Sequence, residues 1–157
     1  MQKITPFLWF DNQAEEAANF YVSLFKNSHI DDVSRYGEGM PMPAGTAWTV
    51  TFTLEGVTFT ALNGGPYYKL NPAFSMQVDC ADQAEVDRLW NALSAVPEAE
   101  SCGWLVDKYG LSWQIVPSVF ESLIQDPNPA KAGAVTQAML QMKKLDIAGL
   151  QAAYDKA

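Results

Sequence analysis

Hydrophobic and polar positions follow the same order of patterns twice along the chain. A strand-like run, Ile4 to Phe10, precedes a segment from Gln13 to Phe25 whose apolar residues lie three and four apart. Later the run Phe74 to Cys80 precedes a second such segment, Gln83 to Leu93. Spacings of three and four place apolar side chains on one face of a helix. The pattern therefore predicts two related strand–helix pairs, each helix burying one face against a sheet.

The two predicted helices begin in similar sequences. Asn12 lies three residues before Glu15, and Asp82 lies three residues before Glu85. This is the spacing of an N-cap residue and a glutamate that reaches back to it. We therefore expect Asn12 and Asp82 to cap the two helices.

A hairpin is predicted after each helix. In the first, residues alternate in character from Thr49 to Leu54 and from Val57 to Leu62, on either side of Glu55-Gly56. In the second, Gly103 to Val106 and Leu111 to Val116 flank a turn at residues 107–110. Strict alternation is typical of strands with one buried face. Counting from this turn pairs Trp104 with Trp113, both on the helix-facing side.

The complete pattern predicts an α+β fold of two β-α-β-β-β modules in a single domain, residues 1–157. Module one spans 1–66 and includes an extra strand at His29 to Arg35, and module two spans 72–117. In module two, residues 95–101 must serve as both loop and short strand. A helical tail, residues 118–157, comes next, with helices expected at 118–125 and 130–143 and a last one capped by Asp146. Two curved sheets facing each other would enclose a cleft.

Composition and charge limit the classes of partner that the chain can have. The chain has 157 residues, 48% of them hydrophobic, but no apolar run of the roughly 20 residues that a bilayer crossing needs. Its net charge of −8 and its lack of a Lys/Arg cluster beyond Lys143-Lys144 disfavour nucleic acid and anionic membranes, and favour a neutral or cationic small molecule. The start of the sequence has no secretory signal pattern, so the expected location is the cytoplasm. Cys80 and Cys102 match no metal or redox spacing, and we expect buried, reduced thiols rather than a redox or catalytic pair.

Several segments resemble the PhnB-like family, also labelled 3-demethylubiquinone-9 3-methyltransferase-like, of the vicinal oxygen chelate (VOC) superfamily, which includes glyoxalase I, bleomycin-resistance proteins and extradiol dioxygenases. The resemblance covers nearly the whole chain and is most specific in the second hairpin. The segments that carry it are residues 7–10, 17–25, 62–66, 82–90, 102–114 and, in the tail, 138–147.

The resemblance implies the two-module fold and a metal site in the cleft of superfamily enzymes. The positions that would supply its ligands are Thr5, Thr60, Ser75 and Gln114. Because these side chains are hydroxyls and an amide rather than imidazoles or carboxylates, we expect no metal and no other cofactor. The only histidine, His29, falls on the extra strand and is expected at a surface or edge. The family label names a methyltransferase, but no Gly-x-Gly-x-x-Gly sequence comes after a strand and opens a helix.

Strand alternation places a set of hydroxyl, amide and aromatic side chains on the open faces of the two sheets. Apolar walls with a few polar groups are typical of small-molecule sites. Asp79 is the one candidate acid or base. The expected ligand-binding residues are Phe7, Trp9, Thr58, Thr60, Ser75, Gln77, Asp79 and Gln114; Thr51, Leu105 and Ser112 are placed on the same open faces.

Three functions remain open at this point. The chain could bind a small molecule without a metal, as bleomycin-resistance proteins do. It could be a glyoxalase-type lyase or isomerase with a metal on other ligands, or a dimeric scaffold whose cleft is vestigial. A homodimer is expected because sheet edges need cover and because the tail carries more apolar residues than one short unit can easily bury.

Overall fold

The computed structural model describes residues 2–157, which form two units: one ends at Leu70 and the other runs from Asn71 to Ala157. Each unit has its own sheet and its own core, and each is described by itself.

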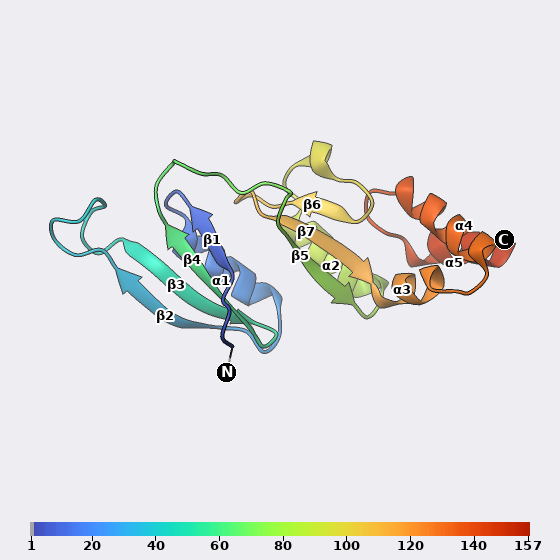
Figure 1. Ribbon diagram of the computed structural model, residues 1–157, viewed down its shortest axis with the longest axis horizontal. Helices are drawn as coiled ribbons and strands as arrows, with labels where there is room; N and C mark the ends of the chain where they lie inside the picture. The colour runs from blue at the N-terminus through green and yellow to red at the C-terminus, as the bar shows by residue number, and fades with distance from the viewer. Residues whose placement is uncertain (1) are drawn as a thin grey trace. The chain divides into compact units, whose positions relative to one another are not determined.

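The first unit is a four-stranded sheet with one helix on one of its faces (Figure 1). Its elements are β1 (Phe7–Phe10), α1 (Ala14–Leu24), β2 (His29–Arg35), β3 (Ala47–Leu54) and β4 (Val57–Asn63). The strand order is β1-β4-β3-β2, with β1 parallel to β4 and the other pairs antiparallel. The core between helix and sheet contains Leu8, Phe10, Ala14, Ala17, Ala18, Tyr21, Val50, Phe52, Phe59 and Ala61.

The start of α1 differs from the prediction. Asn12 does not cap it: the N-cap is Gln13, which makes no side-chain cap bond. Instead the Ala14 N–H donates to Oδ1 of Asn63, at the end of β4, over 2.8 Å. Asn63 is buried, and its Nδ2 donates to the Ala47 carbonyl. A residue 49 positions away therefore satisfies the helix end, which no local sequence pattern shows.

The second unit repeats this order with one strand fewer. Its sheet has the order β5-β7-β6, built from β5 (Ser75–Cys80), β6 (Trp104–Val106) and β7 (Ser112–Pro117), and α2 (Gln83–Leu93) contributes Val86, Leu89, Trp90 and Leu93 to the core. Asp82 caps α2 as predicted, accepting from the Glu85 N–H at 2.9 Å. The short strand expected within residues 95–101 is replaced by a 3₁₀ turn, Pro97–Ala99, and a single bridge between Ser101 and Trp104.

The pairing of β6 with β7 corrects the prediction for the two tryptophans. Trp104 lies opposite Gln114, and Leu105 lies opposite Trp113. The turn is one residue longer than expected, because the Asp107 N–H donates to the Leu111 carbonyl and Leu111 belongs to the turn. A shift of one residue exchanges the faces of a strand. Leu105 is therefore in the core with Trp113, and Trp104 is on the open face.

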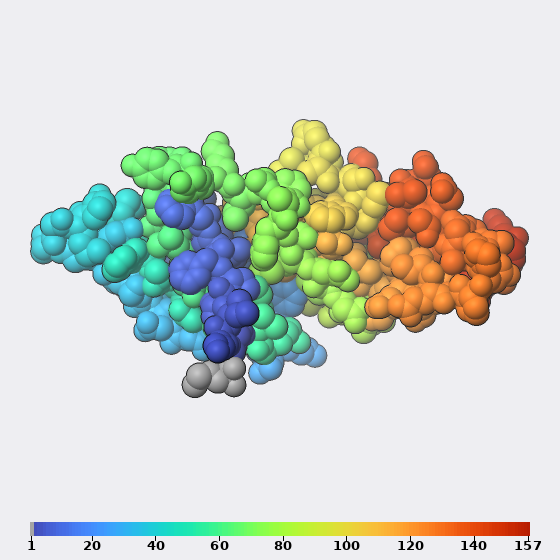
Figure 2. Space-filling model, viewed as in Figure 1, coloured from blue at the N-terminus to red at the C-terminus, as the bar shows by residue number. Residues whose placement is uncertain are grey.

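The tail consists of α3 (Ser118–Ile124), α4 (Pro129–Leu140) and α5 (Ile147–Lys156), with Asp146 capping α5 as predicted. Figure 2 shows these helices, orange to red, packed together. They share a small core of Leu123, Val135, Leu145 and Leu150, flanked by Val119, Phe120, Met139, Met142 and Tyr154. Much of the apolar surface that suggested a partner chain is thus buried within the tail itself.

The segment before α5 attaches the tail to the rest of the second unit. The Cys102 and Gly103 N–H groups donate to the carbonyls of Met142 and Lys143, each over 2.8 Å. Gln83 on α2 donates to the Leu145 carbonyl at 3.1 Å and accepts from the Ile147 N–H at 2.8 Å. Lys144 contacts Asp87 of α2 at 2.8 Å. The tail is therefore fixed against both the helix and the hairpin of this unit.

The architecture is the predicted α+β class, two sheet-and-helix modules followed by helices. Within residues 2–157 no helix combines the length and apolar character needed to cross a membrane.

Candidate functional site

The open face of the second sheet carries four of the predicted site residues. Ser75, Gln77 and Asp79 alternate along β5, and Gln114 lies directly opposite Gln77 on β7. Met76, Cys80, Trp113 and Ile115 point the other way and are buried. Strand alternation therefore brings Ser75, Gln77, Asp79 and Gln114 together on one surface, as the sequence indicates.

Two hydroxyls on this face differ in their hydrogen bonding. The Gln114 amide Nε2 donates to Ser75 Oγ over 2.9 Å, which fixes the orientation of the amide. Ser112, directly opposite Ser75, is 1% exposed, and its Oγ has no hydrogen-bond partner within residues 2–157. A buried polar atom without a partner costs about 1–3 kcal/mol. Because the Ser112 oxygen is fully buried, it lies beneath the face and is not exposed to a ligand.

Asp79, the candidate acid or base, lies near the end of β5 and contacts the tail. It is exposed, and its Oδ1 accepts a hydrogen bond of 2.7 Å from Ser118, the first residue of α3. This contact links the end of β5 to the start of the tail. It gives Asp79 a role in attaching the tail to the sheet.

The first sheet holds the other four predicted residues. Phe7 is 62% exposed, whereas Thr60, opposite it in the β1–β4 register, is 7% exposed. Thr58 Oγ1 lies 3.2 Å from Thr53 Oγ1. Trp9 donates its indole N–H to the Gly65 carbonyl at 2.9 Å and meets Tyr68 edge-on. The polar atoms of Thr58 and Trp9 thus already have partners within this unit.

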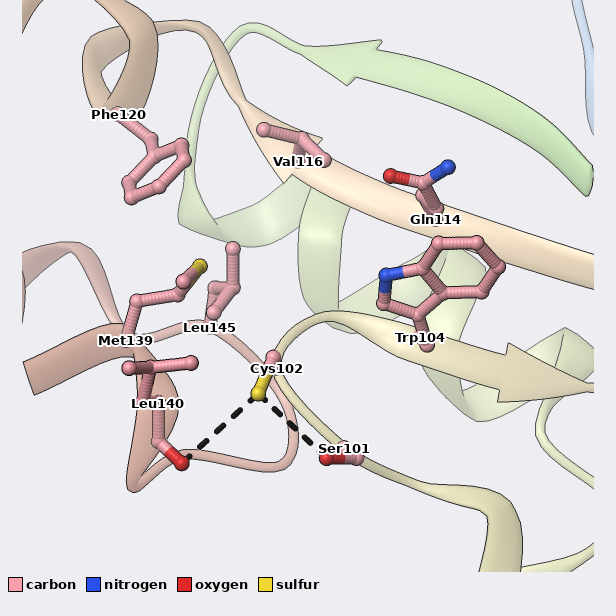
Figure 3. A pocket seen from close by; sticks show the side chains of 9 residues that line it. All are labelled: Ser101, Cys102, Trp104, Gln114, Val116, Phe120, Met139, Leu140 and Leu145. Atoms are coloured by element: carbon pink, nitrogen blue, oxygen red, sulfur yellow. Dashed lines mark hydrogen bonds between the residues drawn. The ribbon is translucent and has the colours of Figure 1, made fainter. Parts of the chain in front are cut away.

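A pocket of about 440 Å³ lies on the open face of the second sheet, between the sheet and the tail (Figure 3). Trp104, Gln114 and Val116 form its sheet side, and the tail forms the opposite side with apolar residues. The full lining is Ser101, Cys102, Trp104, Gln114, Val116, Phe120, Met139, Leu140 and Leu145. Gln114 is the one predicted site residue among them.

Sequence reasoning misses the rest of this pocket. It assigns Trp104 to the core because it counts the turn after β6 one residue short. The tail residues are recognisable as apolar, but nothing local shows that they face a sheet. The apolar stripe of 135–142 is the available signal, and only packing shows what it lies against.

The two cysteines occupy different environments. Cys80 is fully buried, and burial, followed by the nearby carboxylates of Glu85 and Asp79, raises the pKa of its thiol to about 12. Cys102 is half-buried and lines the pocket, with Sγ 3.4 Å from Ser101 Oγ. Cys80 fits the expected inert thiol, whereas Cys102 is more accessible than expected. Both are free.

The residues present do not fit the superfamily's metal. Of the four corresponding positions, Ser75 and Gln114 are hydrogen-bonded to each other, and Thr60 is nearly buried. Within residues 2–157 no three His, Cys, Asp or Glu side chains are grouped to hold an ion. Neutral hydroxyl and amide oxygens are weak ligands for the metals of such sites. His29 is exposed on the edge strand β2, where its Nε2 lies 2.9 Å from Asp31.

Two sheet-and-helix modules in one chain are the fold of the vicinal oxygen chelate class. The chain belongs to the PhnB-like family of that class: the model of the family described as 3-demethylubiquinone-9 3-methyltransferase matches residues 2–116. No curated protein matches the chain.

Solved structures are similar over much the same share of the chain. A putative 3-demethylubiquinone-9 3-methyltransferase, PhnB protein, from Bacillus cereus is 40% identical, with a TM-score of 0.65, covering 74% of this chain and 99% of its own. Protein PA1353 from Pseudomonas aeruginosa is 21% identical, with a TM-score of 0.56, covering 74% and 98%. The family match ends at residue 116, so it does not extend to the resemblance suggested for residues 138–147. The tail side of the pocket lies outside the matched region.

Proposed function

We propose that this protein binds a small molecule on the open face of its second sheet, without a metal ion. The observation that carries this proposal is the pocket of about 440 Å³ beside Gln114. Pockets for small ligands generally measure about 300–1,000 Å³ and combine apolar walls with a few polar groups. This pocket has the hydrocarbon side chains of Val116, Phe120, Leu140 and Leu145, together with Met139, around the Gln114 amide and the Trp104 indole.

The remaining expected site residues are part of the proposal. Ser75 supports it because it holds the Gln114 amide, and Gln77 and Asp79 extend the same polar face. Phe7, Trp9, Thr58 and Thr60 are proposed as the ligand-facing residues of the first sheet.

The test uses N-phenyl-1-naphthylamine, an uncharged dye that fluoresces in apolar sites. We expect saturable binding, unchanged by EDTA, with shifts of the Trp104 indole and Gln114 amide signals in ¹⁵N NMR spectra. Val116→Trp adds a large side chain to the pocket lining and should weaken binding about tenfold or more, because the apolar area that the dye then fails to bury contributes about 1.4 kcal/mol or more. Asn91→Trp, an exposed change on α2, is the matched control and should leave binding unaltered.

Two other activities are tested on the same protein. Metal-dependent lyase chemistry would require about one equivalent of zinc, nickel or iron, lost in Gln114→Ala; elemental analysis with that result would overturn the metal-free proposal. Methyl transfer, the activity in the family's description, has no support in the fold. Gly64 and Gly65 come after β4 and pack around Trp9 instead of opening a helix that could hold a nucleotide phosphate.

We also propose that the chain forms a homodimer and acts in the cytoplasm. Strands β1 and β2 are edges of the first sheet, and Ile4, Phe7, Tyr67 and Tyr68 are exposed in that unit. Edge strands and exposed apolar side chains favour association. Sedimentation of dilute protein tests the dimer, and a single species of 17.3 kDa at micromolar concentration would contradict it.

A further inference from the structure

The pocket presents a hydrogen-bond donor and an acceptor side by side. Trp104 and Gln114 are directly opposite each other in the β6–β7 register. In Figure 3 the indole nitrogen of Trp104 and the amide oxygen of Gln114 both point toward the tail side of the pocket. The amide nitrogen of Gln114 is already engaged by Ser75, so the oxygen is the group that remains available.

Neither of these two groups has a partner in the part of the chain that the structure describes, residues 2–157. The three tryptophans Trp9, Trp90 and Trp113 differ: their indole N–H groups donate to Gly65, Glu100 and Asp107. The fifth tryptophan, Trp48, is exposed. A tryptophan that becomes buried usually finds an acceptor for this donor. The Trp104 N–H and the Gln114 oxygen are therefore available to a bound molecule.

The rest of the pocket selects against charge. Its other walls are Val116, Phe120, Met139, Leu140 and Leu145, with only the Ser101 hydroxyl and the Cys102 thiol as further polar groups. No charged side chain lines it, so an ion would lose its hydration without a counter-charge. The net charge of −8 adds a long-range disadvantage for anions.

We propose that the pocket takes a neutral molecule with a ring-sized apolar body and an edge that carries an acceptor next to a donor, as in a lactam. The Trp104 N–H donates to the carbonyl oxygen of the ligand, and the Gln114 oxygen accepts from its N–H. The apolar body packs on the tail, which lies outside the region matched by the family. This inference rests on the proposed function and specifies its ligand class.

The test compares three probes with the same fused-ring size in the full chain. 2-Quinolinone has the lactam edge, 2-methoxyquinoline lacks its donor, and quinoline-2-carboxylate is an anion. We expect 2-quinolinone to bind about tenfold or more tightly than either of the others, since each lost hydrogen bond leaves a polar group of the site unpaired. Binding should shift the Trp104 indole N–H signal.

Variants assign the selectivity to its residues. Gln114→Leu should weaken 2-quinolinone about tenfold while changing 2-methoxyquinoline far less, because only the lactam donates to the Gln114 oxygen. Trp104→Phe should weaken both probes, because each of them carries an acceptor for the indole N–H. Trp48→Phe, which changes an exposed indole of the first unit, is the matched control. On α4, Leu140→Lys should weaken the neutral probes and improve the anion, whereas Gln137→Lys, exposed on the same helix, should do neither.

The outcomes separate this inference from the proposed function. If N-phenyl-1-naphthylamine binds but the three quinoline probes bind equally, or 2-quinolinone does not bind, the ligand class is wrong while small-molecule binding stands. If the dye also fails to bind, both are wrong. Equal losses of 2-quinolinone and 2-methoxyquinoline in Gln114→Leu would show that this residue shapes the pocket without contacting the lactam edge, and would overturn the inference.

Discussion

The two units have similar sequences and similar sheets, but different segments cover the open faces of these sheets. In the first unit the connector after β4 returns over the open face: Gly64 approaches Trp9 so closely that an added Cβ would lie 2.3 Å from its ring. In the second unit the chain continues into helices, which form one side of a pocket over Trp104 and Gln114. Similar sheets therefore acquire different surfaces because different segments continue the chain after their last strands.

The glutamine at the start of each helix shows the same divergence. Gln13 is exposed and makes no cap bond, whereas Gln83 donates to Asp87 and Leu145 and accepts from Ile147. The two residues are at the same place in the repeat. Gln83 contacts the tail, and its hydrogen bonds to Leu145 and Ile147 fix the start of α5. The role of a repeated residue therefore depends on its neighbours in space.

The largest expected effect is at Trp113 of the second unit and Phe59 of the first. Each is a buried aromatic residue three positions after the glycine of its hairpin turn, Gly110 or Gly56. Trp113→Ala should lower the free energy of unfolding by about 4–5 kcal/mol, and Phe59→Ala by about 3 kcal/mol. Trp113 is fully buried and also donates to Oδ2 of Asp107, which would lose this partner inside the core. Urea denaturation measures both. An equal or larger loss for Phe59→Ala would show that the hydrogen bond from Trp113 to Asp107 adds nothing to stability.

The next effect tests the contact of Gly64, in the connector after β4, with Trp9 on the open face of the first sheet. Gly64→Ala should destabilise by about 1–3 kcal/mol, because the added methyl group would overlap the Trp9 ring. Gly133→Ala on α4 is the matched substitution: nothing lies within 4 Å of its added Cβ, and it should stabilise by about 0.5–1 kcal/mol. Thermal and urea unfolding of both variants give the signs. A neutral Gly64→Ala would show that Trp9 can move away freely.

A smaller effect is expected at the two glutamines. Gln83→Ala should cost about 1–2 kcal/mol, since Leu145 and Ile147 each lose a hydrogen bond. Gln13→Ala should change stability by less than about 0.5 kcal/mol. Amide hydrogen exchange should show faster opening of α5 in the first variant only. Unchanged exchange in α5 would mean that the tail core holds the helix without this anchor.

The smallest effect is a dependence of the tail on extreme pH. Tyr154 donates to Asp126 over 2.6 Å; this bond lowers the pKa of Asp126 from 3.8 and raises the pKa of Tyr154 from 10.0. The stabilisation is present between these values. It is lost as pH falls below about 3.8 and Asp126 is protonated, and as pH rises above about 10 and Tyr154 ionises. Hydrogen exchange of α4 and α5 across pH tests this. Tyr154→Phe should abolish the alkaline dependence and reduce the acid one, because the Asn128 N–H still donates to Asp126.

Local patterns in the sequence were sufficient for the elements that depend on near neighbours. Apolar spacing located both helices within a residue or two, Asp82 and Asp146 were recognisable as caps, and alternation assigned Ser75, Gln77, Asp79 and Gln114 to one face. These predictions succeed because a side chain's face and a helix end are set by residues within a few positions. The proposed ligand residues depend on the same alternation and stay a prediction until binding is measured.

Contacts between distant residues control the remaining features, which only the folded chain reveals. The capping of α1 by Asn63 joins residues 49 positions apart. The hairpin turn has five residues, and the resulting register places Trp104 on the open face instead of in the core. The apolar tail could have covered a partner, but it buries Leu123, Val135, Leu145 and Leu150 among themselves and places its remaining apolar side chains over Gln114. Hydrophobic packing is non-directional and joins residues far apart in sequence, so an apolar pattern shows that a face must be buried and tertiary structure shows against which partner.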